Sequence, residues 1–393
     1  MISPQTKHFN YIFTGAGLAA LMTVYKMVIS GKFDDKSILL LDQNPKKTND
    51  RTWCFWTENP TLWEKVISKK WHAALYADQH FQRVLNLTPY SYNMIAGLDF
   101  YNHIFERITK QKNIIFLQQK VTGCKEIKAA VEVTTESDSY TCDQLFNSIY
   151  DPVAINKNTK YPVLQQHFIG WFIKSDEDFF NSDQATFMDF SVPQKGNTRF
   201  MYVLPTSKKE ALVEYTLFSK HLLKKEEYER EIVKYIEKLG LKNYQIVEKE
   251  QGSIPMTSFP FWKNNTKNIL HIGTAGGWTK ASTGFTFSNS DKKSTELITF
   301  LQTQTDFSKF HKKTKFWFYD LLLLDILAAK NELGVRIFSA LFQKGKPSLI
   351  FKFLDEQTTF FEDLQVIIKC PKWLFVKTLM KRFFLKSHPN KSL

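Results

Sequence analysis

The sequence predicts an α/β fold, in which a Rossmann-type domain is interrupted by an inserted antiparallel β-sheet and followed by a C-terminal helical region. Three observations predict this fold. The chain begins with a strand, a glycine turn, a helix and a second strand. A β-rich middle follows, and a second glycine-rich turn comes directly after a strand near residue 270. The chain has 393 residues, which is enough for two or three domains and a large core.

The N-terminal stretch has the pattern of a dinucleotide site. An apolar run ends at Gly15 and Gly17, a helix follows, and a second apolar run ends in Asp42. Gly15 permits a sharp turn, Gly17 lets the backbone approach a pyrophosphate, and Ala20 is small enough for helix and strand to pack closely. The helix N-terminus favours the phosphates, and Asp42 can accept hydrogen bonds from a ribose diol. The pattern favours a bound dinucleotide over a plain glycine turn. Its position close to the N-terminus, as in many flavoproteins, favours FAD over NAD.

The composition is that of a globular protein with a basic surface. Hydrophobic residues make up 43% of the chain and charged residues 23%, which excludes a disordered protein. The net charge of +14 suits an acidic surface, either nucleic acid or anionic lipid. The first ten residues hold no apolar signal core, and no stretch reaches the roughly 18 consecutive apolar residues of a spanning helix. We therefore expect a cytoplasmic protein.

The cysteines and histidines do not have the spacing of metal ligands. Cys54, Cys124, Cys142 and Cys370 are far apart in the sequence, and the nine histidines are scattered. A metal site and a disulfide framework are both disfavoured, and reduced thiols are the expectation for a cytoplasmic protein.

The stretch after Asp42 combines charge with aromatic residues. Asp50 and Arg51 precede a run that contains Trp53 and Trp56. The aromatic side chains could form a wall with a polar rim, or the run could be an ordinary core strand with Asp50 and Arg51 paired at its mouth. Composition alone favours the ordinary strand. A helix is predicted over 98–111, and strands over 113–117, 131–135 and 143–149.

The middle of the chain reads as strands over 166–173, 185–192, 199–204 and 211–218, and the last two form a predicted hairpin. The period of two places Glu214 on one face with Leu212 and Phe218. A carboxyl on an apolar face must be paired, protonated or functional, and desolvation would raise its pKa toward that of a general acid. An exposed face, or an ion pair with a neighbour such as Arg199, is the alternative. Asp189 raises the same question more weakly.

A helix is predicted over 226–239, ended by Gly240, and nothing in it indicates chemistry. The stretch 269–289 is more informative, because a strand runs into glycines and then into a probable helix. Many flavoproteins return such a turn to the flavin ribityl chain and pyrophosphate, although Thr274 stands here where an Asp is usual. A ligand loop is favoured over a plain glycine-rich loop. The residues that would contact the cofactor are Gly273, Gly276, Gly277, Thr283 and Gly284.

The C-terminal part is predicted to be helical, apolar and basic, with helices over 315–329 and 335–342. From 370 to 393 six basic residues alternate with aromatic and aliphatic ones, and no Asp or Glu occurs. This mixture suits the headgroup boundary of a membrane, and a packed helical cap with a solvated basic face is the alternative. Nucleic acid is disfavoured because no recognition fold accompanies the charge.

Together these motifs resemble the FAD-dependent lycopene cyclase family, of the bacterial lycopene β-cyclase type, over nearly the whole chain. The stretch Asn49-Asp50-Arg51-Thr52-Trp53-Cys54-Phe55-Trp56 is the most specific. The other motifs are Gly15-Ala16-Gly17-Leu18-Ala19 with Asp42, Phe187-Met188-Asp189-Phe190, Tyr202-Val203-Leu204-Pro205, Leu212-Val213-Glu214-Tyr215-Thr216, Gly276-Gly277 to Thr283-Gly284-Phe285, Phe318-Tyr319-Asp320 and Phe353-Leu354-Asp355-Glu356. Thr274 in place of Asp is similar to what cyclases of this family show.

The resemblance implies a reaction and its cofactors. Each open ψ-end of lycopene closes to a β-ring, giving β-carotene through γ-carotene without net oxidation, and the family needs reduced FAD with NADPH as the usual electron source. Glu214 is then the expected proton donor and Asp189 the second candidate, while Trp53 and Trp56 could give cation–π support. At about 4 Å and an effective dielectric near 20, an anionic reduced flavin would stabilise a substrate cation by about 4 kcal/mol.

The resemblance also implies a domain organisation, and two other interpretations of the function stay open. A Rossmann-type FAD-binding domain would occupy 1–160, interleaved with substrate-domain segments, and return over 263–300. The inserted antiparallel β-sheet substrate domain would occupy 161–262, and the C-terminal helical region 301–393. We expect a lycopene substrate and peripheral attachment to a membrane surface. A redox flavoenzyme of similar fold, such as an isoprenoid reductase or hydroxylase, and a non-enzymatic basic lipid- or nucleic-acid-binding protein are the rival interpretations.

Overall fold

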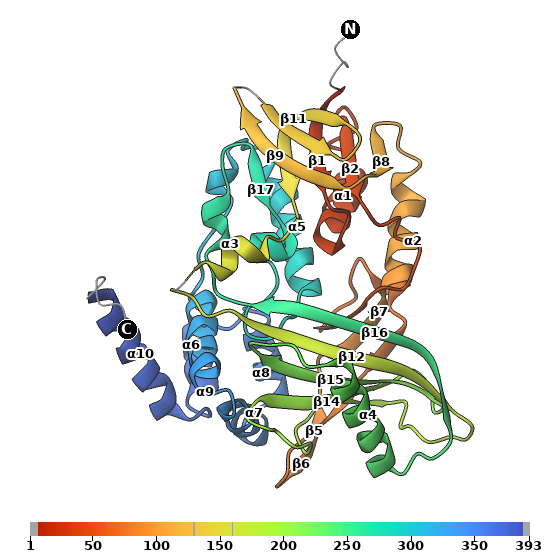
Figure 1. Cartoon of the computed structure of the whole chain (residues 1–393), viewed down its shortest axis with the longest axis vertical. Helices are drawn as coiled ribbons and strands as arrows, with labels where there is room; N and C mark the ends of the chain where they lie inside the picture. Colours follow the sequence, from red (N-terminus) through yellow and green to blue (C-terminus); the bar gives the residue numbers. More distant parts are fainter. Residues whose placement is uncertain (1–6, 129, 159, 388–393) are drawn as a thin grey trace.

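The protein is described here by a computed structural model that covers residues 7–128, 130–158 and 160–387. Three β-sheets and a set of C-terminal helices make up the fold (Figure 1). The predicted α/β class is confirmed, with a Rossmann-type sheet at one end of the molecule and the inserted sheet at the other. None of the helices in the described ranges has the length and apolar character that crossing a membrane requires.

The first sheet is built mainly from the N-terminal part of the chain. Its strand order is β8-β2-β1-β11-β10-β9, and β17 pairs with β11. The pairs among β8, β2, β1, β11 and β17 are parallel, whereas β9, β10 and β11 are antiparallel neighbours. The bounds are β1 Lys7–Thr14, β2 Ile38–Asp42, β8 Ile114–Gln118, β9 Val121–Ile127, β10 Ala130–Thr135, β11 Ser139–Asn147 and β17 Ile269–His271.

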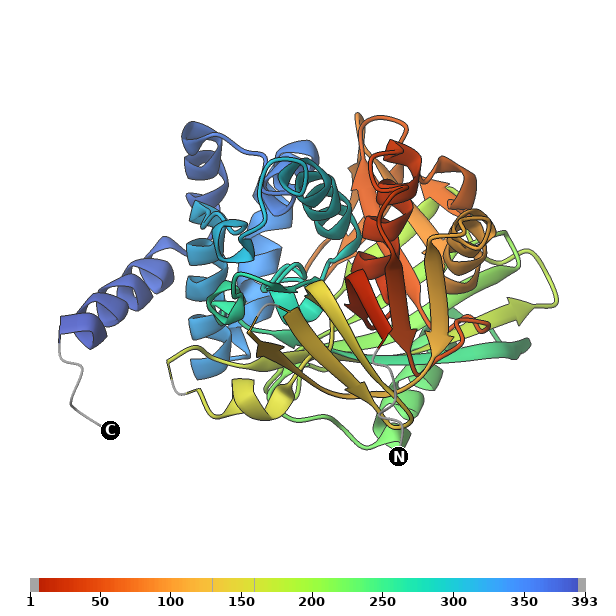
Figure 2. The same cartoon turned by 90° about the horizontal axis from the view of Figure 1, so that it is seen from above.

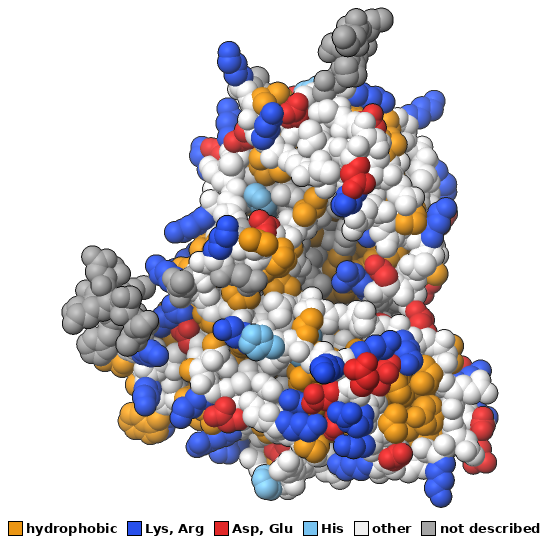
Figure 3. Space-filling model, in the orientation of Figure 1, with side chains coloured by type: hydrophobic (Ala, Val, Ile, Leu, Met, Phe, Trp, Pro, Cys, Tyr) orange, Lys and Arg blue, Asp and Glu red, His pale blue; other side chains and the backbone are white. Residues whose placement is uncertain are grey.

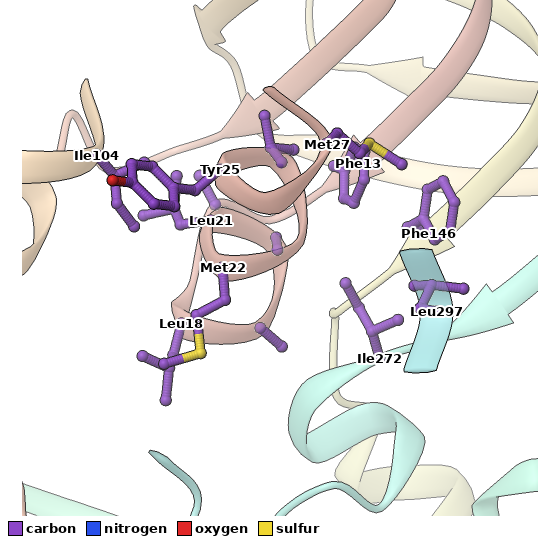
Figure 4. Packing of buried hydrophobic residues seen from close by; sticks show 14 of the residues in the cluster. Phe13, Leu18, Leu21, Met22, Tyr25, Met27, Ile104, Phe146, Ile272 and Leu297 are labelled. Carbon is purple, nitrogen blue, oxygen red and sulfur yellow. The ribbon is translucent and has the colours of Figure 1, made fainter. Parts of the chain in front are cut away.

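Helix α1 (Leu18–Ser30) packs between this sheet and two other helices, α2 (Gly97–Ile108) and α5 (Phe287–Phe300). It ends at Gly31, whose φ of 65° is the left-handed conformation that glycine adopts without strain. Figure 4 shows its apolar side chains between Ile104 of α2 on one side and Phe13 and Phe146 on the other. The tight packing of α1 fixes the position of the glycine turn at its N-terminus.

The second sheet has the order β16-β12-β15-β14-β13-β5-β6 and is antiparallel except for the β5–β13 pair. The predicted hairpin is present, because β14 and β15 pair through the turn at 206–209. Helix α4 (Lys225–Leu239) covers one face of the sheet, and Gly240 ends it. The bounds are β5 Ala73–Ala77, β6 Gln82–Asn86, β12 Leu164–Ser175, β13 Gln184–Asp189, β14 Thr198–Pro205, β15 Glu210–Ser219 and β16 Tyr244–Met256.

A small third sheet connects the two large ones. It has the order β3-β7-β4, with β3 at Thr52–Thr57, β4 at Lys69–Trp71 and β7 at Ser91–Ala96. Strands β5 and β6 of the inserted sheet lie between β4 and β7 in the sequence, so the N-terminal 160 residues supply strands to all three sheets. The aromatic run after Arg51 is therefore a strand, as composition favoured.

The C-terminal part is helical, as predicted. It contains α6 Lys315–Ala329, α7 Leu333–Lys344, α8 Pro347–Leu354, α9 Phe360–Ile367 and α10 Lys372–Ser387. Helix α10 lies at the outer edge of the molecule beside α6, where Arg382 pairs with Asp325 (Figure 2). Of the predicted basic and aromatic C-terminal residues, Lys391 lies outside the described residues. The remaining short elements are α3 Pro152–Asn156, η1 Glu64–Val66, η2 Phe261–Asn264, η3 Gly273–Gly276 and η4 Phe307–Lys309.

Candidate active site

The N-terminal glycine turn has the geometry that its sequence indicates. Gly15 has a φ of 93°, and a Cβ there would lie 2.2 Å from Ser148 Oγ, so both conformation and space require glycine. A Cβ on Gly17, in contrast, would meet no atom within 4 Å. Ala20 is fully buried under the turn. The backbone at Gly17 therefore borders an open space at the N-terminus of α1, as a cradle for a phosphate group would.

Asp42 lies at the end of β2, next to the turn. One carboxylate oxygen accepts a hydrogen bond of 2.7 Å from the Ala16 N–H, and the other accepts one of 2.8 Å from the Asn44 N–H. Lys46 Nζ lies 3.2 Å from the same carboxylate, and both side chains are about nine-tenths buried. Asp42 therefore ties β2 to the glycine turn, and Lys46 covers part of the place predicted for a ribose.

The second glycine stretch, residues 273–286, is called the return loop below. It begins at Gly273, where a Cβ would lie 3.3 Å from the Cβ of Ala19 in α1. Its first turn is η3, and a Cβ on Gly276 would lie 2.1 Å from the His271 carbonyl oxygen; Gly277 follows with a φ of 69°. The structure thus brings the two glycine stretches together at one end of α1, although they are about 250 residues apart in the sequence.

The second half of the return loop lies against the inserted sheet. A Cβ on Gly284 would lie 2.4 Å from the Oε1 atom of Gln166 on β12. That Oε1 atom and the hydroxyl of Thr283 are buried, and neither has a hydrogen-bond partner. Two unsatisfied polar atoms beside a glycine-rich loop fit a polar ligand that would complete their hydrogen bonds.

A cavity of about 180 Å³ lies between the return loop and the inserted sheet. Its walls come from the motif at 50–54, from strands β12, β14, β15 and β16, and from the return loop. The lining is mixed: polar and charged residues alternate with nine aromatic or aliphatic side chains, which are Trp53, Tyr92, Phe168, Tyr202, Leu204, Leu212, Ile254, Phe285 and Phe287. The cavity therefore suits an apolar group placed next to a polar cofactor.

Glu214 is the acid in this cavity. It is 8% exposed and shares its face of β15 with Leu212 and Phe218, as the strand period predicts. Its carboxyl group accepts a hydrogen bond from the Thr216 hydroxyl. It also makes a hydrogen bond to the carboxyl group of Glu250 on β16. Two carboxyl groups in contact can form that bond only if one of them carries a proton.

Burial and the negative charge of Glu250 raise the pKa of Glu214. Burial also raises the pKa of Glu250, while a 2.8 Å hydrogen bond from the Thr52 hydroxyl and the bond from Glu214 lower it. Burial therefore raises the pKa of both acids, so that the pair can hold one proton near neutral pH, and the raised pKa of Glu214 suits a proton donor. The alternative ion pair between Glu214 and Arg199 is wrong, because Arg199 contacts Glu227 at 2.9 Å beside α4.

Comparison with known proteins decides the family. The family model described as "Lycopene cyclase protein" matches residues 10–380, which is nearly the whole chain. The chain belongs to the lycopene cyclase family. It is 25% identical over 288 residues to the "Lycopene beta-cyclase" of Pantoea ananas, with 71% of each chain covered.

The fold of this chain is similar to the folds of several solved structures. A flavoprotein/dehydrogenase from Cytophaga hutchinsonii matches with a TM-score of 0.59 at 12% identity, covering 95% of this chain and 100% of its own. A geranylgeranyl bacteriochlorophyll reductase-like protein from Thermoplasma acidophilum matches with a TM-score of 0.56 at 10% identity, covering 98% and 99%. A mutant of the halogenase PltM in complex with FAD also matches at 0.56 and 10%, covering 98% and 93%. At these identities the likeness shows the fold alone.

The family motifs in the C-terminal helices lie behind the return loop. Lys280, in the loop, lies 3.2 Å from Asp320 of α6 and 3.0 Å from Glu356, which follows α8. Its side chain is 2% exposed, and the neighbouring Lys292 pairs with Asp355 at 2.8 Å. These ion pairs join the C-terminal helices to the loop, so the helices help to fix the wall of the cavity.

Not all of the predicted site residues meet in the cavity. Asp189 faces α4 on the opposite side of the sheet, where its carboxylate accepts a 2.7 Å hydrogen bond from the Tyr235 hydroxyl. Trp53 lines the cavity, whereas Trp56 packs against Phe285 and donates a hydrogen bond to the Phe351 carbonyl. Of the two acids predicted from the sequence, the structure brings only Glu214 to the cavity.

Sequence reasoning missed Glu250. Strand β16 contains Glu248, Lys249 and Glu250 in succession, a pattern that is typical of an exposed edge strand. The sequence offers one signal of a special role for Glu250. This acid lies two residues before Gly252, in a stretch where acidic and basic residues alternate. That signal is weak, since the approach of Glu250 to Glu214 depends on a strand that lies between them.

Proposed function

We propose that this lycopene cyclase is a β-cyclase that closes the ψ-ends of lycopene to β-rings by acid catalysis, giving β-carotene through γ-carotene. The observation that carries the proposal is Glu214, a buried acid that lies among aromatic and aliphatic side chains in the cavity beside the return loop, where burial raises its pKa. Cyclisation of a polyene needs a strong proton donor in surroundings without water, because the intermediate is a tertiary cation. A carboxyl group held neutral by burial supplies that donor near neutral pH.

The steps follow from the position of this acid. Glu214 donates its proton to the terminal double bond, and the neighbouring double bond attacks the resulting cation to form the ring. A base then removes a proton next to the ring cation, so the reaction is an isomerisation without net oxidation. Trp53, Tyr92, Tyr202 and Phe285 line the cavity, and their ring faces can stabilise a passing positive charge.

FAD is the cofactor that the site fits best. The open space at Gly17 fits the phosphates of a dinucleotide, and the unsatisfied polar atoms of Thr283 and Gln166 fit polar groups of its ring system. Gly15, Gly17, Ala20 and Asp42 would hold the nucleotide half, and Gly273, Gly276, Gly277, Thr283 and Gly284 the other half. In its reduced form, with NADPH as the electron source, FAD would supply an electron-rich ring that favours nearby positive charge.

The experiment that tests the proposed function compares products by mass. Purified protein, loaded with FAD and reduced by NADPH without oxygen, should convert lycopene to β-carotene of unchanged mass. A redox flavoenzyme of the same fold would add or remove hydrogen or oxygen, and would give a product of altered mass. A product of altered mass, or no product from flavin-loaded protein, would refute the proposed cyclisation.

The glycine turn gives a second test. Gly17→Val would place a branched side chain in the open space at the start of α1, where the pyrophosphate is expected. We expect the variant to fold and to be purified without flavin. Flavin bound to the Gly17→Val protein in the same amount as to the parent would place the pyrophosphate elsewhere.

We also propose that the protein attaches to a membrane surface through α9 and α10. Phe361 and Trp373 are each 76% exposed, and Val376, Met380 and Phe383 are about half exposed along one side of α10. Lys372, Lys377 and Lys381 are exposed on the same helix, and no acidic residue interrupts them. Figure 3 shows apolar side chains near Lys and Arg at this edge of the molecule. Apolar anchors with basic neighbours fit an anionic lipid surface, into which lycopene partitions.

Sedimentation with liposomes tests the attachment. The parent should bind vesicles that contain anionic lipid and should be released in part by high salt, which screens only the electrostatic attraction. Phe361→Ser combined with Trp373→Ser should weaken binding, whereas Val84→Ser, which changes an exposed residue of β6, should not. Equal binding by all three proteins would locate the membrane contact on another surface.

A further inference from the structure

In the inserted sheet, a glycine on the middle one of three strands leaves an open space between two acidic residues. In the β16-β12-β15 part of the sheet, Gly170 of β12 is paired with Glu214 on one side and with Glu250 on the other. A Cβ on Gly170 would lie 3.4 Å from the Glu214 Cβ and 3.3 Å from the Glu250 Cγ. Because Gly170 has no side chain, the two carboxyl groups reach across the middle strand and touch.

Hydroxyl groups hold each acid in a defined orientation. The Thr216 hydroxyl donates to Glu214 Oε1, and the Thr52 hydroxyl donates to Glu250 Oε2 at 2.8 Å. Both hydrogen bonds come from residues outside β12, so they fix the acids independently of that open space. The result is an oriented pair of carboxyl groups that lines the cavity and can share one proton.

We propose that Glu250 is the base of the cyclisation, which takes the proton from the new ring after Glu214 has protonated the chain. The proposal rests on the proposed function and names the residue that completes it. The O–H bond of Glu214 breaks as a C–H bond forms on the substrate, and the ring C–C bond forms next. The Glu250 carboxylate then takes a proton from a carbon beside the cation, and the electrons of that C–H bond form the ring double bond.

The pair returns to its starting state without any other reactant. After the reaction Glu250 carries the proton and Glu214 is the anion, and the proton passes back to Glu214 through the hydrogen bond between them. No oxidant or reductant is consumed. One proton circulates, and the pair is ready for the second end of the substrate.

The position of the base decides the product. A tertiary ring cation has three neighbouring carbons from which a proton can leave, and each choice gives a different position of the double bond. A β-ring requires removal from the carbon that has just formed the ring bond. A base held by Thr52 on one side of the cavity selects that carbon, whereas loss to water would give a mixture of β-rings and isomeric rings.

Glu250→Gln tests the assignment, because it keeps the size and most hydrogen bonds of the side chain but removes the base. We expect the rate of cyclisation to fall by about 10²–10⁴. The remaining product should contain ring isomers other than the β-ring. The alkaline limit of activity should move to lower pH, because Glu214 loses the negative neighbour that helps to keep it protonated.

Glu248→Gln is the matched control, since it makes the same change on the same strand outside the cavity. Its rate and its pure β-ring product should match those of the parent. Gly170→Ala separates the two carboxyl groups without changing their charge, and its Cβ meets mainly the end of the flexible Leu212 side chain, at 2.8 Å. This variant should fold and should lose rate with the same appearance of ring isomers.

Two results would overturn the assignment. One is a Glu250→Gln protein that makes only β-rings at close to the parent rate, since Glu214 would then serve as both acid and base. The other is a loss of rate in Glu250→Gln with unchanged product and an unchanged pH profile, which would make Glu250 a structural residue. Both results need an active parent enzyme, so a parent that does not cyclise lycopene would refute the proposed function instead.

Discussion

Two groups of buried ionisable side chains lie next to the return loop, and they are stabilised in opposite ways. In the first, Lys280 contacts Asp320 and Glu356, so opposite charges meet within about 3 Å. In the second, Glu214 contacts Glu250, so two acids meet, and Arg51 acts on Glu250 only as a minor charge. The first group ties helices to a loop, and the second lines the cavity.

The difference shows that buried ionisable groups can either stabilise the fold or take part in a reaction, depending on the charge of their partners. Opposite charges satisfy each other, and the Lys280 pKa is accordingly raised to about 12 despite burial. Two acids can be buried together only if a proton is held between them. That proton is poorly solvated and available to a substrate. The Glu214–Glu250 pair, which is the less stable of the two arrangements, is therefore the reactive one. Variants in each group should therefore fail in different assays.

The largest expected effect is on catalysis. Glu214→Gln keeps the side-chain shape but removes the transferable proton, so we expect the rate of β-carotene formation to fall by at least ~10²–10⁴. The variant should fold and retain flavin, because Gln can hydrogen-bond to both Thr216 and Glu250. The assay is cyclisation of lycopene under anaerobic, NADPH-reduced conditions, with flavin content measured in parallel. A rate close to that of the parent would show that the proton donor is another residue.

The next effect is on stability. Lys280→Met leaves the buried Asp320 and the partly exposed Glu356 without their cation, which should lower the free energy of unfolding by about 3–5 kcal/mol. Denaturant unfolding of the flavin-free protein measures the change. Lys293→Met is the matched control, because Lys293 pairs with Glu296 near the surface, and such pairs contribute about 0–1 kcal/mol. Equal stability of the two variants would contradict a structural role for the Lys280 group.

The same comparison explains what the sequence could predict. Both glycine stretches were predicted because local patterns specify them, and Glu214 was predicted because strand alternation places an acid on an apolar face. The fold class followed from the order of these patterns and is confirmed. The pairing of Lys280 with Asp320 could not be predicted, since nothing local indicates which cation a buried acid will meet across 40 residues.

Two other features could not be predicted from the sequence, for a related reason. Strands β4, β5, β6 and β7 lie in a stretch for which no elements were predicted, and two of them join a sheet whose other strands begin at residue 164. Glu250 and Glu214 are separated by β12 in the sheet, so their contact depends on the order of three strands and on one glycine. Strand order is a long-range property that residue periodicity does not contain.

A smaller effect concerns pH. Because the folded protein raises the pKa of Glu214 above its ordinary value of 4.5, the protonated acid contributes stability that is complete below about pH 4.5 and is lost as the pH rises toward the folded pKa. We expect the parent to lose on the order of 1–3 kcal/mol of unfolding free energy in this range. The Lys280 group should keep its contribution until the pH approaches 12.

Glu214→Gln should remove the part of this pH dependence that comes from Glu214, because glutamine does not titrate, and should leave the part that comes from the raised pKa of Glu250. Unfolding curves of both proteins at a series of pH values from about 4 to 9 give the comparison. If the free energies of unfolding of parent and variant changed with pH in parallel, Glu214 would be ionised in the folded protein. The Glu214 group and the Lys280 group would then not be stabilised in opposite ways.

The smallest expected effect is at Asp189, a buried acid that belongs to neither group. Its carboxylate accepts hydrogen bonds from the Tyr235 hydroxyl at 2.7 Å and from the Ser191 N–H at 2.8 Å, and no cation or second acid is among these partners. In Asp189→Asn the amide oxygen can still accept from the Ser191 N–H, and the amide nitrogen can donate to Tyr235. We therefore expect a rate within about threefold of the parent and a loss of stability of about 1 kcal/mol, which is the usual size for one altered hydrogen bond. The cyclisation assay used for Glu214→Gln measures the rate. A loss of rate in Asp189→Asn as large as that in Glu214→Gln would mean that an acid facing α4 controls the chemistry, and the cavity would no longer be the place where the proton is transferred.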